Sequence, residues 1–304
     1  MCDIRTVGGV LCVNKPSGCT SHDVIYKIRR MFGTKQVGHT GTLDPLAEGV
    51  LVIMIGRAVK ASEFLVSEKK EYLAGLRLGI TTDTEDITGK ITGRYEGIFP
   101  SPASVREAAE SFRGDILQVP PMYSALKVDG KKLLELARAG REIERAPRPV
   151  RVDALEVMPT EDRAEYRLLV RVSKGTYIRT LCSDIGKALG TGGVMSSLVR
   201  LSCGDFGLED SVTLDRLSDM DENQRLSCLR PVDSLFSGCP GVKLADFYAR
   251  LGLCGCELYQ NKLGTHIPEN TLVRLCDKDG FFALGRVRIY PDGSAIKPVK
   301  QFRI

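Results

Sequence analysis

One aspartate stands out because its neighbours would hold it in a fixed place. Asp44 lies within residues 38–51, which read Gly-His-Thr-Gly-Thr-Leu-Asp-Pro-Leu-Ala-Glu-Gly-Val-Leu. The Gly and Pro residues favour a tight loop directly ahead of an apolar strand, and such a loop can hold a reactive side chain in fixed geometry. A carboxylate held in this way could act as a nucleophile. An Asp before a Pro is also an ordinary helix N-cap, so the loop alone leaves a structural role open.

Further residues of chemical interest follow along the chain. Residues 70–79 (Lys-Glu-Tyr-Leu-Ala-Gly-Leu-Arg-Leu-Gly) place Tyr72 on a predicted strand. Residues 172–181 (Val-Ser-Lys-Gly-Thr-Tyr-Ile-Arg-Thr-Leu) lead into a predicted helix, and residues 198–201 read Leu-Val-Arg-Leu. A tyrosine on a strand often only packs, but a flipped nucleobase also needs an aromatic face. Together with Lys-Pro-Ser-Gly-Cys-Thr-Ser at residues 15–21, these segments resemble the motifs of the pseudouridine synthases, in particular the bacterial family that modifies the T-loop uridine of transfer RNA.

The resemblance implies a role for each matching residue. Asp44 would be the catalytic carboxylate, and Arg179 would pair with it. Tyr72 would pack on the target base, while Leu198 would line the uracil pocket. Tyr177 would be a second tyrosine of the active site.

The predicted site includes two more residues, and at one position the chain differs from the family. The residue of the family that matches His39 lies beside the extruded nucleotide, so we expect His39 to fill space in the loop rather than to exchange protons. Lys60 is a candidate phosphate contact, although an exposed helix lysine would give the same pattern. Where the family more often has two consecutive arginines, this chain has Val199 and Arg200, which argues against a phosphate contact at residue 199.

The chemistry implied by the resemblance needs few groups. Converting uridine to pseudouridine breaks the bond from ribose C1′ to uracil N1 and rejoins the ring through C5. There is no net redox change and no group donor, so we expect no cofactor and no metal. Covalent capture by a carboxylate would split one hard displacement into easier steps. Whether Asp44 attacks C1′ or C6, or instead abstracts a ribose proton, stays open.

Two further expectations concern proton chemistry. Asp44 must be ionised to act; burial raises the pKa of a carboxyl group, while an adjacent guanidinium lowers it. We therefore expect Arg179 to keep Asp44 charged and oriented. The surplus proton on C5 needs an acceptor, for which Tyr177 is the candidate and an ordered water the competitor.

A basic segment resembles the part of the family that holds RNA. Residues 119–127 (Val-Pro-Pro-Met-Tyr-Ser-Ala-Leu-Lys) open a stretch similar to the insertion that grips the T arm, here about residues 120–151. Its arginines would make salt-sensitive phosphate contacts, although a block of charge is often only a solvated face. The arginines are Arg138, Arg141, Arg145, Arg148 and Arg151.

Composition and charge are those of a globular protein. With 304 residues, 43% apolar and 27% charged, the chain can bury a large core. No apolar run approaches the roughly 18 residues of a membrane span, and no secretory signal is evident, so we expect a cytoplasmic protein with reduced thiols. Cys254 and Cys256 have no second pair at zinc spacing, which argues against zinc. Of the net charge of +5, residues 241–304 contribute ten Lys or Arg against six Asp or Glu.

Strand and helix patterns are mixed without strict alternation, which favours an α+β fold with a mixed, mainly antiparallel sheet. Ser237-Gly-Cys-Pro-Gly241 predicts a boundary between a catalytic domain of residues 1–237 and a second domain of residues 238–304. The second domain has β-rich segments at 271–277, 281–290 and 295–304, and it resembles a PUA domain, a small RNA-binding β-barrel. Elsewhere we expect strands at 7–14, 50–55, 71–78, 150–159, 166–173 and 194–201, and helices at 21–32, 58–66, 104–112, 131–139, 176–190 and 214–219.

Two other functions stay open. One is a non-catalytic protein that binds or folds transfer RNA, and the other is a guide-RNA-dependent pseudouridine synthase subunit. An enzyme is favoured because Asp44, Tyr72, Tyr177 and Arg179 recur within their motifs, which binding alone would not require. The guide-dependent relatives have a shorter insertion. We therefore expect an isomerase for the T-loop uridine at position 55 of transfer RNA, working as a monomer with no obligate protein partner.

Overall fold

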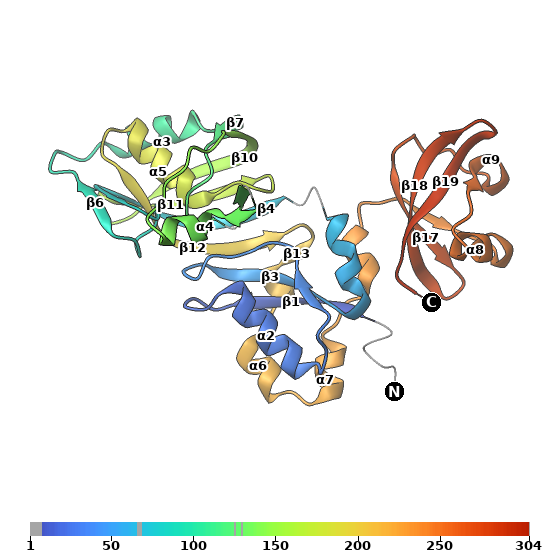
Figure 1. Cartoon of the computed structure of the whole chain (residues 1–304). Helices are drawn as coiled ribbons and strands as arrows, with labels where there is room; N and C mark the ends of the chain where they lie inside the picture. The colour runs from blue at the N-terminus through green and yellow to red at the C-terminus, as the bar shows by residue number, and fades with distance from the viewer. Residues whose placement is uncertain (1–7, 66–68, 125, 129, 304) are drawn as a thin grey trace.

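The computed structural model describes residues 8–65, 69–124, 126–128 and 130–303 (Figure 1). Within this part of the chain, a ten-stranded mixed sheet forms the larger unit. Its main path runs β14 (Val212–Thr213), β1 (Gly9–Lys15), β3 (Glu48–Ile55), β12 (Gly193–Cys203), β4 (Lys70–Leu78), β11 (Glu165–Val172), β10 (Arg148–Pro159) and β7 (Gly114–Gln118). Strand β13 (Phe206–Gly207) pairs with β12, and β2 (Val37–His39) pairs with β3.

Most neighbours in this sheet are antiparallel, and the pairs β1–β14 and β3–β12 are parallel. The predicted α+β class with a mixed, mainly antiparallel sheet is therefore confirmed. A small hairpin, β5 (Ile80–Thr82) with β6 (Ile91–Arg94), follows β4. A second hairpin, β8 (Lys127–Val128) with β9 (Lys131–Lys132), lies between β7 and β10.

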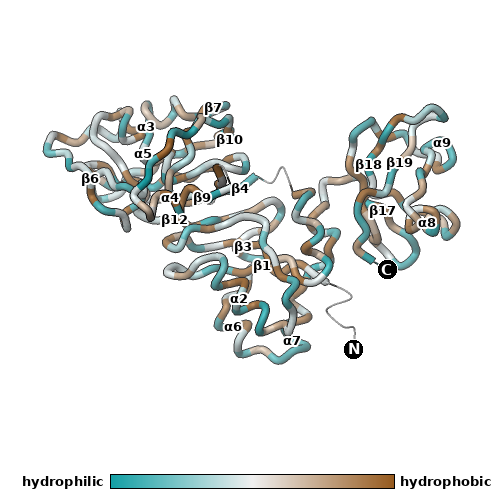
Figure 2. Tube along the Cα trace, in the orientation of Figure 1, coloured by the Kyte–Doolittle hydropathy of each residue, from teal (hydrophilic) through white to brown (hydrophobic). Residues whose placement is uncertain are grey.

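Strand β3 is apolar along its length because both of its faces are buried. Leu51 and Ile53 point into a core that is covered by helices, while Val50 and Val52 point into a second core on the other face. Side chains alternate between the two faces of a strand. Figure 2 colours the chain by hydropathy and shows hydrophobic stretches within both sheets. The residues just before β3 are thus attached to a strand that is packed against a core on each of its two faces.

Four helices contribute to the first core: α2 (Ser21–Met31), α3 (Pro102–Glu110), α5 (Ile178–Ala188) and α6 (Leu214–Asp219). Figure 1 shows α2 and α6 together near β1 and β3, with α7 (Glu222–Ser227) beside them. The 3₁₀ helices η1 (Gly56–Glu63) and η3 (Val232–Phe236) supply residues to the second core, and η2 (Leu208–Asp210) follows β13. The short α4 (Leu133–Arg138) lies in the insertion. No described helix is both long and apolar enough to cross a membrane.

The C-terminal part has its own five-stranded sheet, ordered β15 (Gly241–Lys243), β17 (Leu272–Asp277), β18 (Gly280–Tyr290), β19 (Gly293–Gln301) and β16 (Leu258–Tyr259). Helices α8 (Asp246–Leu253) and α9 (Gln260–Leu263) pack on this sheet. The rings of Phe281 and Phe302 pack at a tilt against Phe236 of η3, with centroids 6.2 and 6.1 Å from it, and they lie 5.3 Å from each other. They share the second core with β1 and β3. The boundary between residues 237 and 238 stays a prediction.

Some local predictions were wrong. From the sequence, Ser21 is the candidate N-cap of the helix expected at 21–32. The N-cap of α2 is instead Thr20, because the Thr20 hydroxyl accepts from the Asp23 N–H while the Asp23 carboxylate accepts from the Thr20 N–H. The helix expected at 58–66 is the 3₁₀ helix η1 as far as it is described, and the helix expected from residue 131 begins at 133, after β9. Helices α7, α8 and α9 were not predicted.

Candidate active site

The Asp44 loop is a turn and not a helix cap. The carbonyl of Asp44 accepts a hydrogen bond from the Ala47 N–H at 3.0 Å, with Pro45 at the second position of the turn, where its fixed φ fits. Strand β3 begins at Glu48, directly after this turn. The alternative that Asp44 caps a helix is therefore wrong, and its side chain is not used by a helix terminus.

The motif at residues 15–21 holds this loop in place. The Ser21 hydroxyl accepts from the Leu43 N–H at 2.8 Å and donates to the Leu43 carbonyl at 3.0 Å. Lys15 has no exposed surface, and its ammonium donates to the carbonyls of Cys19 at 2.7 Å and Pro45 at 3.4 Å. The residues on both sides of Asp44 are thus tied to β1 and to the start of α2. These contacts hold the main chain on both sides of Asp44, and none of them is made to the Asp44 carboxylate.

Arg179 lies closest to Asp44 among the cations of the described residues. Its Nη2 atom is 3.7 Å from Asp44 Oδ1 and donates to the Tyr123 carbonyl at 2.6 Å. The residue is 5% exposed, and its guanidinium carbon lies 5.8 Å from the centre of the Tyr177 ring. Arg179 therefore contacts Asp44 and lies against the ring of Tyr177, two of the residues expected to act with it. The partner carbonyl of Tyr123, in the insertion, was not predicted.

The electrostatics of Asp44 are a balance of opposing effects. Burial raises the pKa of Asp44, the Arg179 guanidinium lowers it, and the nearby Asp86 carboxylate raises it further. Lys15 adds a smaller lowering effect. The buried Asp86 is fixed because its Oδ1 accepts from the Thr88 N–H at 2.9 Å. Asp86 belongs to the Thr-Asp-Thr-Glu-Asp segment at 82–86 and was not among the predicted site residues.

Tyr72 and Leu198 lie on neighbouring strands of the sheet. Tyr72 on β4 pairs directly with Arg200 on β12, and Leu198 lies two residues away on β12. The pKa of Tyr72 is raised by burial, while a hydrogen bond with Arg200 lowers it. The fully buried Arg200 also donates to the carbonyls of Val50 at 2.6 Å and Gly41 at 3.1 Å. Arg200 therefore links Tyr72 to the Asp44 loop, a role that the sequence did not reveal.

His39 lies on β2, five residues before Asp44, and its Nδ1 is buried without a hydrogen-bond partner. The pKa of His39 is lowered by burial, and the Arg200 cation lowers it as well. The role of His39 in filling space in the loop stays a prediction.

Lys60 is not brought to Asp44. It lies on η1, beyond the C-terminal end of the eight-residue strand β3, whereas Asp44 precedes the start of that strand. At about 3.3 Å per residue the strand alone spans roughly 26 Å. The Lys60 ammonium is 3.4 Å from the carbonyl of Gln301, to which it donates. A phosphate contact at Lys60 stays a prediction, and it would lie away from the reacting carboxylate.

The insertion has a small core of its own, formed by Met122, Leu133 and Leu136 with their neighbours. Its arginines divide into two groups. Arg145 donates to the Pro120 carbonyl at 3.2 Å, and Arg151 pairs with Asp115 and Asp153. Arg141 and Arg148 are exposed, and the Arg138 side chain lies outside the described residues. Arg141 and Arg148 are therefore the arginines most accessible to a polyanion.

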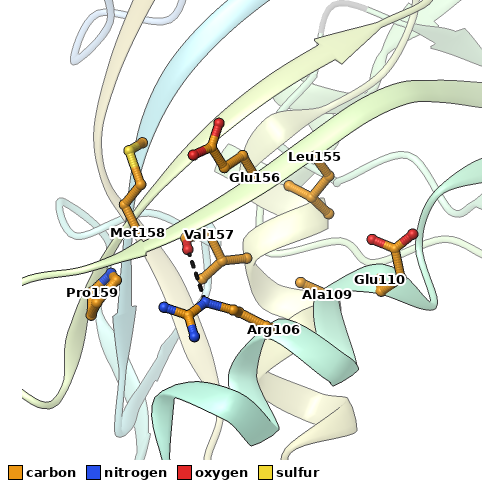
Figure 3. A pocket seen from close by; sticks show the side chains of 8 residues that line it. All are labelled: Arg106, Ala109, Glu110, Leu155, Glu156, Val157, Met158 and Pro159. Carbon is orange, nitrogen blue, oxygen red and sulfur yellow. Dashed lines mark hydrogen bonds between the residues drawn. The ribbon is translucent and has the colours of Figure 1, made fainter.

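A separate groove of about 410 Å³ lies between α3 and β10 (Figure 3). Arg106 crosses it and donates from Nε to the Val157 carbonyl at 3.4 Å. The groove is lined by Arg106, Ala109, Glu110, Leu155, Glu156, Val157, Met158 and Pro159. None of these is a predicted site residue, so size alone does not locate the chemistry in this fold.

Comparison with known proteins gives matches over most of the chain. Residues 29–178 match the N-terminal domain of the TruB family of pseudouridylate synthases, and residues 179–237 match the C-terminal domain of tRNA pseudouridylate synthase B. The chain is 45% identical to the tRNA pseudouridine synthase B of Alkaliphilus oremlandii over 89% of both chains. It is 46% identical to that of Clostridium kluyveri over 88% of this chain and 91% of the relative.

Solved structures show the same fold. A chain from a Cbf5–Nop10–Gar1 complex is 27% identical, with a TM-score of 0.74 over 99% of this chain and 86% of the other. A chain from an archaeal box H/ACA Nop10–Cbf5 complex is 25% identical, with a TM-score of 0.72 over 99% of this chain and 87% of the other. The sequence matches and the fold point the same way: this chain belongs to the TruB family of pseudouridylate synthases.

Proposed function

We propose that this protein isomerises uridine to pseudouridine at position 55 in the T loop of transfer RNA, with Asp44 as the nucleophile on a flipped-out uridine. The observation that carries this proposal is the immobilised Asp44 carboxylate, which lies 3.7 Å from the buried Arg179 guanidinium. The same guanidinium lies against the ring of Tyr177. Its relatives of 45–46% identity are named tRNA pseudouridine synthase B, which supports transfer RNA as the substrate.

The residues divide the work as follows. Extruding a base costs a few kcal/mol, and stacking on the ring of Tyr72 returns about 1–3 kcal/mol. Asp44 bonds to C1′ as the C1′–N1 bond breaks, and the uracil anion stays in the pocket beside Leu198. C5 of the uracil then attacks C1′, which forms the C5–C1′ bond, breaks the bond to Asp44 and releases the carboxylate. The proton on C5 then leaves and N1 takes one up, so the product is an isomer of the substrate. We assign removal of the C5 proton to Tyr177, supported by its place against Arg179.

The guide-dependent alternative is less well supported. The solved neighbours that come from Nop10–Cbf5 assemblies are 25–27% identical, whereas the relatives named for transfer RNA reach 45–46%. A match to the tRNA pseudouridylate synthase B model at residues 179–237 favours the same choice.

We propose further that the enzyme acts as a monomer, without a protein partner, in the cytoplasm. The support is chemical: nine described cysteines are free thiols, which suits a reducing compartment. Sedimentation of the purified chain at the concentration used for activity would test the monomer, because activity only from a larger species would contradict it.

The decisive experiment compares Asp44→Asn with the wild type on unmodified transfer RNA, without added protein, guide or metal. The change replaces one oxygen by NH₂ and removes the charge. Mass mapping should find pseudouridine at the T-loop uridine with wild type and none with the variant. Asp162→Asn is the matched control, because that carboxylate is half exposed and pairs with Arg77. Normal product from Asp44→Asn, or no product from wild type, would refute the proposal.

A further inference from the structure

Gln118 is a buried amide that the proposed mechanism does not use. It is 2% exposed and is the last residue of β7. Its Oε1 accepts from the Tyr177 N–H at 2.8 Å, and its Nε2 donates to the Tyr177 carbonyl at 3.1 Å. Both halves of one planar amide therefore bind the main chain of a single residue, which fixes the position and the direction of that residue.

Besides Gln118, the main chain at Tyr177 is held by the first helical hydrogen bond, in which the Leu181 N–H donates to the Tyr177 carbonyl at 3.1 Å. Tyr177 is the N-cap of α5, and its side chain makes no capping hydrogen bond. The chain arrives through Gly175, whose φ of +82° belongs to an exposed turn. The first N–H groups of a helix have no partner within the helix, so the Tyr177 N–H would be left unpaired without Gln118. The direction in which the Tyr177 ring leaves the backbone thus depends on this contact.

Gln118 also lies at the base of the insertion. It pairs across the sheet with Arg148, so the chain leaves for the insertion after Gln118 and returns at its strand partner. A second tie lies close by, since Arg179 donates to the Tyr123 carbonyl within the insertion. The start of α5, with Tyr177 and Arg179, is therefore bound by residues of the segment that would grip RNA and of its base.

We propose that Gln118 is a positioning residue for the isomerisation: it sets the backbone of Tyr177, and with it the first turn of α5, relative to Asp44. This inference rests on the proposed function. Gln118 touches no reacting atom, so its loss should slow the chemical step while leaving RNA affinity nearly unchanged. A misplacement of about 1 Å in a catalytic group can cost on the order of 100-fold in rate.

The chain contains a matched control for this test. Gln260, the first residue of α9 in the C-terminal part, is 3% exposed, and it binds the main chain of Ile267 in the same way. Its Oε1 accepts from the Ile267 N–H at 2.7 Å, and its Nε2 donates to the Ile267 carbonyl at 3.0 Å. The same substitution at Gln260 reproduces the loss of a buried clamp without affecting Tyr177.

The test compares Gln118→Glu with Gln260→Glu in the full-length chain. The new carboxylate still accepts from the backbone N–H, but its second oxygen faces a carbonyl instead of donating to it. Single-turnover formation of pseudouridine should fall about 100-fold in Gln118→Glu and change less than about threefold in Gln260→Glu. The Kd for unmodified transfer RNA should stay within about threefold in both. Equal rates in the two variants, or a loss that appears only in Kd, would overturn the proposal.

Two additions make the result complete. Gln118→Met keeps the volume and removes both hydrogen bonds, and it should show the same slow step if the Glu variant does not fold. In the Tyr177→Phe background, Gln118→Glu should cost less than about threefold, because both changes act on one element, and full additivity would contradict the inference. Wild type that forms no pseudouridine would refute the proposed function itself, whereas active wild type with unaffected Gln118 variants would refute only the role of Gln118.

Discussion

Replacing Arg179 by Met would test the electrostatic argument most directly. Met keeps much of the buried volume and removes the positive charge that lies 3.7 Å from Asp44. Two unit charges about 4 Å apart at an effective dielectric constant of about 20 interact by about 4 kcal/mol. The Asp44 side chain is 33% exposed, so solvent screening reduces the effect to about 2 kcal/mol. This corresponds to roughly a 30-fold loss of rate near neutral pH.

The same substitution should change the dependence of rate on pH. Asp44 must be ionised to react, and burial already raises its pKa, with Arg179 opposing that rise. Removing Arg179 therefore raises the pKa of Asp44 further, so activity should be lost at a higher pH than in wild type as the pH falls. Single-turnover rates on a transfer RNA transcript, measured across the acidic range, would show this shift.

Two controls accompany the measurement. Arg77→Met removes an exposed arginine that pairs with Asp162, and it should leave both rate and pH dependence unchanged. Arg179→Lys keeps the positive charge but lacks the planar guanidinium. Compared with Arg179→Met, it should return the acidic limb of the pH–rate profile close to its wild-type position, while the rate itself should recover less. Turnover of Arg179→Met near the wild-type rate, or an acidic limb that does not move, would show that the ion pair does not support catalysis.

Two predictions concern stability. Lys15→Met should lower the free energy of unfolding by about 3 kcal/mol, because the carbonyls of Cys19 and Pro45 lose a buried donor, and chemical denaturation would measure it; an unchanged midpoint would contradict the role of Lys15. Gly49→Ala should cost more than about 3 kcal/mol, because Gly49 has φ +99° and an added Cβ would lie 2.3 Å from the Arg200 carbonyl oxygen. A Gly49→Ala protein as stable as wild type would show that β3 and β12 can separate.

The parts of the site that the sequence predicted are those whose residues lie together in the chain. The turn around Asp44 could be inferred because Gly and Pro impose local backbone geometry, and Tyr177 and Arg179 were found because one short motif contains both. Even here the local pattern allowed two structures, a helix cap or a turn. The outcome was decided by Ser21 and Lys15, which bind the loop from another element.

The missing parts depend on pairs that are distant in sequence. Arg200 binds the carbonyl of Val50, which is 150 positions away, and Gln118 binds Tyr177 across 59 positions. Neither contact leaves a local signal, because an arginine or a glutamine on a strand is ordinary until the strand order brings a partner to it. The sheet order places β12 beside β3, which brings Arg200 to Val50, whereas Gln118, at the end of the edge strand β7, meets the residue that precedes α5. In this chain, the residues that hold the proposed catalytic groups are therefore seen only from the topology, whereas the proposed groups themselves could be named from motifs.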